Sequence, residues 1–144
     1  PPGELEALRP AIDRHFGQAG VAAILESLES ESRPEFQPWA AKTLALLGER
    51  SPTLLRVTFE QLRRGRGLPL ADCFRLELNL IHGCFDQGDF VEGVRALIVD
   101  KDNAPRWNPS SLAHVTDASV EAFFVPRWRP PEHPLRHLQP QEAP

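Results

Sequence analysis

The chain has 144 residues, enough for one domain with its own hydrophobic core. Apolar residues make up 41% of it and charged residues 25%, the mixture of an ordinary globular protein, and the formal net charge is −4. No region is basic: residues 1–50 carry 5 basic and 8 acidic side chains, residues 51–109 carry 8 of each, and residues 110–144 carry 3 and 4. This balance excludes a basic nucleic-acid groove and attachment to an anionic membrane surface, and no apolar run approaches the roughly 18 residues of a membrane span.

The cysteines and the basic residues indicate where the protein works. Cys73 and Cys84 fall on one predicted helix, about 16 Å apart, whereas a disulfide needs its two Cα atoms within about 7 Å. We therefore expect two buried free thiols and a reducing, cytoplasmic location. Two Lys against fourteen Arg indicate a GC-rich bacterial gene. The chain begins Pro-Pro-Gly and contains no Met, so we expect a processed chain or a piece of a longer one.

The spacing of apolar residues predicts an all-α fold of about six to seven short helices, because apolar residues recur at helical intervals and no stretch alternates with period two. Ser51 followed by Pro52 marks one helix start, and Thr116 caps a last short helix. Glu92 stands three residues after Asp89, an arrangement typical of a capping box. The expected helices cover residues 4–16, 21–29, 38–47, 52–64, 70–85, a segment from residue 89, and a segment after residue 116. Residues 1–125 would form the domain, and residues 126–144, with six prolines, an extended tail.

Residues 70–85 form the longest predicted helix and contain one irregularity. Placed at 100° per residue from Leu70, Glu77 falls at about 340°, within the apolar arc. A carboxylate there is either paired inside the protein or placed where another surface arrives. We predict a buried ion pair between Glu77 and Arg95. The residues of the apolar arc, which we expect to face the core, are Cys73, Phe74, Leu78, Leu80, Ile81, Cys84 and Phe85.

The residues show no self-contained active site. The sequence has no Gly-rich phosphate loop, no zinc-ligand spacing and no serine elbow. His133 and His137 are four residues apart, but Pro134 between them removes the helical spacing that a metal pair needs, so no metal site is predicted. Lys101 and Arg106 follow the end of a predicted helix, where cations complement the helix dipole or hold a phosphate. We therefore expect no catalytic residue in this chain.

Two stretches, SPTLLRVTFEQLRRG (residues 51–65) and LADCFRLELNLIHGCFDQGDFVEGVRALIVDKDNAPRWNP (residues 70–109), resemble the C-terminal helical region of the crotonase superfamily, which includes the enoyl-CoA hydratases and isomerases. In that superfamily a short turn with an Asp precedes a helix reading Glu-Gly-x-x-Ala-apolar-x-x-Lys. Three residues, rather than two, separate the apolar position from Lys101 here. The ending Lys-Asp-x-x-Pro-x-Trp-x-Pro is similar to that of the 3-hydroxyisobutyryl-CoA hydrolase branch. The matching positions are Asp89, Glu92, Gly93, Ala96, Leu97 and Lys101.

The resemblance implies the C-terminal part of an acyl-CoA thioester hydrolase of valine breakdown. It implies that the acid–base carboxylates and the oxyanion hole belong to a spiral αβ core that this chain does not contain, so the acyl-CoA substrate would bind through that core. It also implies that the helices help to close the CoA site, with Lys101 or Arg106 near the nucleotide end of CoA. No cofactor is implied, because coenzyme A is part of the substrate.

Two alternatives stay open at this point. The chain could belong to an enoyl-CoA hydratase or isomerase, or it could be a stand-alone helical interaction module. We expect the chain by itself to be inactive as a thioesterase and to self-associate through apolar surface, since uncovered patches larger than a few hundred Å² drive association.

Overall fold

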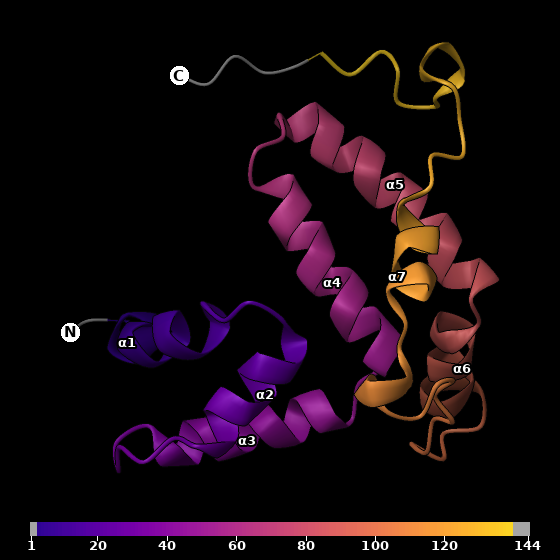
Figure 1. The fold of residues 1–144 in the computed structure, drawn as a ribbon. Coiled ribbons are helices and arrows are strands. Elements are labelled where there is room, and N and C mark those ends of the chain that lie inside the picture. The colour runs from indigo at the N-terminus through magenta and orange to yellow at the C-terminus, as the bar shows by residue number, and fades with distance from the viewer. Residues whose placement is uncertain (1–2, 140–144) are drawn as a thin grey trace. The chain divides into compact units, whose positions relative to one another are not determined.

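The computed structural model describes residues 3–139, and this part of the chain consists of helices and turns without a strand (Figure 1). The predicted all-α class and the predicted number of helices are confirmed. The α-helices are α1 (Glu4–Phe16), α2 (Val21–Glu29), α3 (Gln37–Gly48), α4 (Pro52–Gly65), α5 (Leu70–Asp86), α6 (Asp89–Val94) and α7 (Asp117–Phe124). A π-helix, Arg95–Val99, continues α6, and two 3-10 turns cover Leu112–His114 and Pro130–Glu132.

The helix-start signals work as predicted at two places and fail at a third. The Ser51 side chain accepts a hydrogen bond from the Leu54 N–H at the start of α4, and Thr116 accepts one from the Ser119 N–H at the start of α7. The capping box at Asp89 does not form. Gly88, at φ 89°, is the residue before α6, and the carboxylates of Asp89 and Glu92 bind other segments instead.

The chain divides into two compact units, residues 1–50 and residues 51–144. In the first unit, α2 packs against both α1 and α3 (Figure 1). Pro10 lies inside α1 without ending it. The buried side chains of this unit come from all three helices and from the loop after α2. They are Ala11, His15, Val21, Ile24, Leu28, Glu31 and Ala40.

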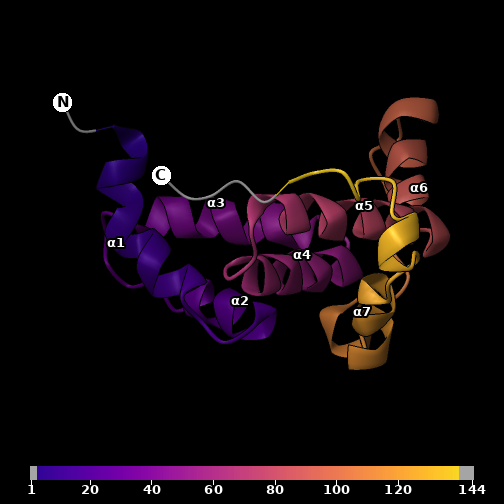
Figure 2. The same cartoon turned by 90° about the horizontal axis from the view of Figure 1, so that it is seen from above.

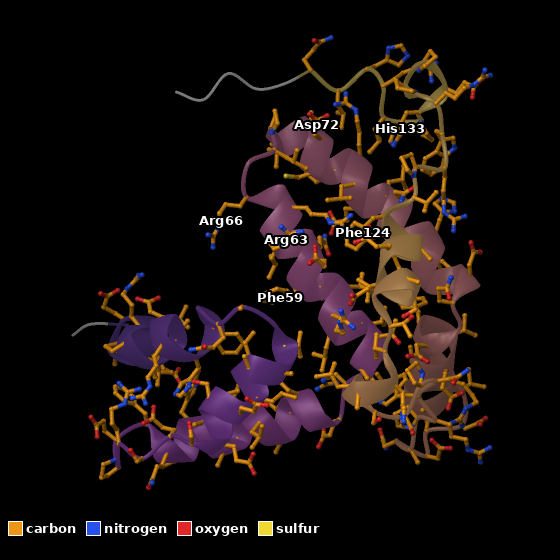
Figure 3. All side chains as sticks on the ribbon, viewed as in Figure 1. Phe59, Arg63, Arg66, Asp72, Phe124 and His133 are labelled. Carbon is orange, nitrogen blue, oxygen red and sulfur yellow. The ribbon has the colours of Figure 1, made fainter. Side chains whose placement is uncertain are left out.

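In the second unit, α4 and α5 form a helical hairpin, and α7 contacts both of its arms. Figure 2 shows α6 and α7 near the C-terminal end of α5. Figure 3 shows Phe124 on the side of α7 that faces α4, where the Arg64 guanidinium lies 3.9 Å from the centre of the Phe124 ring. The main apolar core of this unit consists of the buried residues Val57, Leu80, Val115, Val120 and Phe123, with Leu54, Leu76, Cys84 and Phe124 packed against them.

Most of the α5 face that we predicted to be inward is not buried, although Leu80 of that face belongs to the core and Cys84 packs against it. Asn79 lies opposite the predicted apolar arc of the helix, yet it is buried and donates a 2.8 Å hydrogen bond to the Phe123 carbonyl. Gly83 lies against the Phe123 ring, where small residues permit close packing of α5 on α7. The predicted inward residues Phe74, Ile81 and Phe85 are about half exposed, at 48%, 48% and 56%.

The Pro-rich residues 126–139 lie along α5. The Arg127 N–H donates to the Asn79 side-chain oxygen at 3.0 Å, and Arg75 donates to the carbonyls of Leu135 and Leu138. The Trp128 ring lies between the rings of His82 and His133, at centroid distances of 5.2 and 5.0 Å. Residues 140–144 of the predicted tail lie outside the described residues.

Candidate functional site

The segment after α6 is organised by one arginine. Arg95 begins the π-helix, and its guanidinium donates two hydrogen bonds of 2.8 Å to the Glu92 carboxylate. It also donates to Asp100 at 2.6 Å, to Asp102 at 2.7 Å and to the Ala104 carbonyl at 3.2 Å. A planar guanidinium presents five N–H donors in a fixed geometry, so this side chain holds a turn of the chain in one conformation.

These contacts favour the ionised forms of Glu92 and Asp102. Hydrogen bonds from Arg95 and from the Arg106 backbone N–H lower the pKa of Glu92 to about 2. The hydrogen bonds to Glu92, Asp102 and Asp100 in turn raise the pKa of Arg95 above its ordinary value. The Asp102 pKa is also lowered, mainly by the Ala104 backbone N–H and by Arg95. The loop therefore carries fixed charges throughout the physiological pH range.

A second anchor ties the end of the same loop to the start of α4. Asp89 is buried, and its carboxylate accepts a 2.5 Å hydrogen bond from the Ser51 hydroxyl and a 3.0 Å hydrogen bond from the Asn108 N–H. Trp107, next to Asn108, packs over Gly93, where an added Cβ would lie 3.2 Å from the indole ring. The loop is thus fixed at both ends by carboxylates of α6.

The structure places the two predicted phosphate-binding cations on this loop. Both Lys101 and Arg106 are exposed, and Lys101 has a backbone φ of 56° in the left-handed region. Within the described residues, neither side chain forms an ion pair or a hydrogen bond. The Arg95 guanidinium, by contrast, forms ion pairs with three carboxylates. The loop therefore presents two exposed cations.

The predicted ion pair of Glu77 and Arg95 is wrong. Glu77 is exposed on α5, and across residues 3–139 its side chain has no partner. Arg95 bonds Glu92, Asp100 and Asp102 instead. The physical reason is local geometry, because Glu92 lies one helical turn before Arg95 and the two acids of the following loop fold back onto it.

A small cavity lies in the second unit, with a volume of about 50 Å³. The Thr53 hydroxyl is buried at its wall and has no hydrogen-bond partner among the described residues. This volume suits a water molecule, and pockets for larger ligands run to roughly 300–1,000 Å³. The cavity is lined by Thr53, Leu54, Cys84, Gln87, Asp89, Asn108, Pro109, Ser119 and Phe123.

One polar cluster of the first unit was not predicted. The His15 ring is fully buried and bridges the Ser27 hydroxyl, at 2.8 Å, and the Glu31 carboxylate, at 2.7 Å. Side-chain and backbone hydrogen bonds from Arg33 hold the pKa of Glu31 well below its usual range. The only signal in the sequence was the spacing of four residues between Ala11 and His15, which places them on one face of the helix. An analysis of apolar periodicity misses it, because it counts histidine as polar. With its ring closed to solvent, His15 stabilises the packing of α1 on α2 and cannot reach a ligand.

The thiols and the remaining histidines show no catalytic arrangement. Cys73 and Cys84 are free, as predicted, but half-buried rather than buried. Burial raises the pKa of the Cys84 thiol, which disfavours the reactive thiolate. The His133 Nδ1 atom accepts a hydrogen bond from the Leu135 N–H. Over residues 3–139, no three His, Cys, Asp or Glu side chains are grouped to hold a metal ion, and no helix is long and apolar enough to cross a membrane.

Comparison with known proteins shows the family. The model of the enoyl-CoA hydratase/isomerase family matches residues 1–124. The chain is 37% identical over 123 residues to the mitochondrial 3-hydroxyisobutyryl-CoA hydrolase of Danio rerio, covering 85% of this chain and 31% of that protein. It is 39% identical over 118 residues to the small ribosomal subunit protein mS47 of Arabidopsis thaliana, covering 80% of this chain and 29% of that protein.

Solved structures agree with the sequence match. The crystal structure of a carnitinyl-CoA dehydratase from Mycobacterium thermoresistibile superposes with a TM-score of 0.81 at 35% identity, covering 96% of this chain and 38% of that one. The chain thus spans about a third of the length of the relatives that it matches. The resemblance drawn from residues 51–109 is confirmed, and the chain belongs to the enoyl-CoA hydratase/isomerase family.

Proposed function

We propose that this chain is the helical part of an acyl-CoA thioester hydrolase that acts on 3-hydroxyisobutyryl-CoA in valine catabolism. The observation that carries the proposal is the loop of residues 100–109, which is fixed by Arg95 and Asp89. Within the described chain, the exposed side chains of Lys101 and Arg106 on this loop form no ion pair or hydrogen bond. Two cations on a rigid loop fit the phosphate groups of CoA. The 3-hydroxyisobutyryl group in this proposal is taken from the name of the Danio rerio relative.

The hydrolysis itself would take place elsewhere in the fold. Thioester hydrolysis needs backbone N–H groups that stabilise the oxyanion and a carboxylate that assists the attack of water. Arg95 forms ion pairs with the carboxylates of Glu92, Asp100 and Asp102. The Asp89 carboxylate accepts hydrogen bonds from Ser51 and Asn108. We therefore assign no catalytic role to this chain. It would bind the nucleotide end of CoA and help to close the site.

The uncovered apolar faces of two helices support a docking role. Leu5 and Phe16 of α1 are 76% and 42% exposed, and the exposed large apolar residues of α5 lie on one side of that helix. Leu8 and Ile12 of α1 are half-buried along the same stripe. An α-helix exposes such a stripe when another surface is meant to cover it. The covering surface we propose is the acyl-CoA-binding core of the same fold.

The assay that tests the proposal compares two reactions of the natural protein that contains these residues. Free thiol release from 3-hydroxyisobutyryl-CoA is expected, and hydration of crotonyl-CoA is not. Replacing both Lys101 and Arg106 by Ala should raise KM by about tenfold and leave kcat nearly unchanged, because the loss is in binding CoA. Hydration without thiol release would favour the hydratase alternative. That alternative is consistent with the matching family model and with the similar dehydratase structure.

Two further aspects belong to the proposal. The relative named as ribosomal protein mS47 favours, as a second candidate, a helical module that binds another macromolecule. Thioesterase activity of the natural protein would favour the hydrolase over the binding module.

The cytoplasmic location stays a prediction, since the Danio rerio relative is named as mitochondrial. Cell fractionation of the source organism decides it.

A further inference from the structure

The exposed side of α5 has a charge at its centre. Leu70, Phe74, Ile81 and Phe85 are 54%, 48%, 48% and 56% exposed, and they follow one another at intervals of four, seven and four residues, which keeps them on one side of the helix. Glu77 lies on the same stripe, three residues after Phe74 and four before Ile81. Over this length the helix rises roughly 22 Å, the span of a partner helix of about 15 residues. We call these five residues the α5 stripe.

Nothing within the described chain neutralises this carboxylate. Among residues 3–139, the Glu77 side chain makes no ion pair or hydrogen bond. The nearest cation along α5, Arg75, lies on the other side of the helix. It donates hydrogen bonds there to Asp72 and to the carbonyls of Leu135 and Leu138. The ring of Phe85 lies edge-on to that of Phe90 at 5.0 Å, which extends the apolar surface onto α6.

We propose that the α5 stripe is a docking surface for an amphipathic helix that carries one arginine or lysine in its apolar face, opposite Glu77. Covering the stripe removes Glu77 from water, and a buried carboxylate without a partner is strongly unfavourable, so the covering surface must supply a cation. The four apolar side chains give the area of contact, and the charge pair fixes its register.

The same charge argues against a second copy as the occupant. Two α5 stripes packed about a two-fold axis would bring their Glu77 carboxylates close together, and like charges at an interface are repulsive. The inference rests on the proposed function in one respect, since the helix would belong to the acyl-CoA-binding core. It refines our own expectation of self-association, because association through this stripe would have to be asymmetric.

A library selection tests the proposal on the 144-residue protein. A displayed library of 15-residue helical peptides, with apolar residues on one face and a randomised central position in that face, is selected against the wild-type protein and against Glu77→Arg. We expect Arg or Lys at the central position for the wild type, and Asp or Glu for Glu77→Arg. The same selection against Phe74→Ser should yield few binders.

The affinities of one selected peptide complete the test. Replacing its central Arg by neutral citrulline should weaken binding to the wild type by about tenfold and leave binding to Glu77→Gln within about twofold, since close charge pairs couple strongly at interfaces. Circular dichroism confirms that each variant is folded. Absence of binders, the same central residue in both selections, or a wild-type dimer dispersed by Phe74→Ser would overturn the proposal. Each measurement reads binding alone, so a failed thioesterase assay would leave it standing, and the reverse also holds.

Discussion

The guanidinium of Arg95 and the carboxylate of Glu92 are joined by two hydrogen bonds of 2.8 Å, and this pair is the fixed point from which residues 100–106 are arranged. Replacing Arg95 by Ala should release Asp100, Asp102 and the Ala104 carbonyl together. Amide hydrogen exchange of residues 100–106 should become faster, while exchange within α7 stays the same. Arg129→Ala is the matched control, because among residues 3–139 Arg129 pairs only with the exposed Glu132. Unchanged exchange in the loop of the Arg95 variant would contradict the account.

The same pair predicts a pH dependence. The pKa of Glu92 is about 2 in the folded protein and 4.5 for an ordinary Glu, so ionised Glu92 stabilises the folded loop above pH 4.5. That stabilisation is lost as the pH falls from 4.5 towards 2, because the unfolded state binds its proton first. Loop exchange rates of the wild type and Glu92→Gln should therefore differ at pH 6 and converge near pH 2. A constant difference across this range would show that the charge of Glu92 is irrelevant.

The element boundaries could be predicted from the sequence, but the buried face of α5 could not. Ser51, Thr116 and the glycines mark where helices start and stop, and those signals are local. Burial of α5 depends on Asn79 and Gly83, which meet α7 through a side-chain hydrogen bond and a close approach. An analysis of apolar periodicity counts Asn79 as polar and gives Gly83 no apolar side chain, so it assigns neither residue to the buried face. It cannot distinguish apolar residues that fill the core of a unit from those, like Phe74, left for another surface.

The candidate site shows the same limit. Lys101 and Arg106 were identified because they follow the end of a predicted helix and because the family resemblance implies a place near CoA. No local rule places them on one fixed loop. Arg95 was predicted to reach α5, yet the acids nearest along the chain bind it. Charge pairing over a long range of sequence requires the tertiary arrangement, whereas pairing within one or two turns follows from helix geometry.

Gly83 tests the packing of α5 on α7. An added Cβ would lie 2.8 Å from Cδ1 of the buried Phe123, so Gly83→Ala should lower the free energy of unfolding by about 1–3 kcal/mol through overpacking. Gly48→Ala is the control, because nothing lies within 4 Å of its Cβ position and a helical Gly→Ala change is neutral or favourable. Urea unfolding measures both. Equal effects of the two substitutions would contradict the described contact.

Ser51 tests the junction between α4 and the loop end. Its hydroxyl caps α4 by accepting from the Leu54 N–H at 3.0 Å and donates to buried Asp89 at 2.5 Å. Ser51→Ala loses both contacts, and we expect a loss of about 2–3 kcal/mol in the free energy of unfolding. Thr116→Ala removes an exposed cap alone and should cost about 1 kcal/mol. A smaller loss for Ser51→Ala than for Thr116→Ala would show that Asp89 does not depend on this hydroxyl.

The central claim is that these helices complete an acyl-CoA hydrolase. The most direct measurement replaces the 123 matching residues of the Danio rerio 3-hydroxyisobutyryl-CoA hydrolase by those of this chain and follows CoA release from 3-hydroxyisobutyryl-CoA. Circular dichroism and thermal unfolding establish that the chimera is folded. We expect the chimera to release CoA, and residues 1–144 alone to release none above a control without protein. A folded chimera without thioesterase activity, or activity of the isolated chain, would contradict the account.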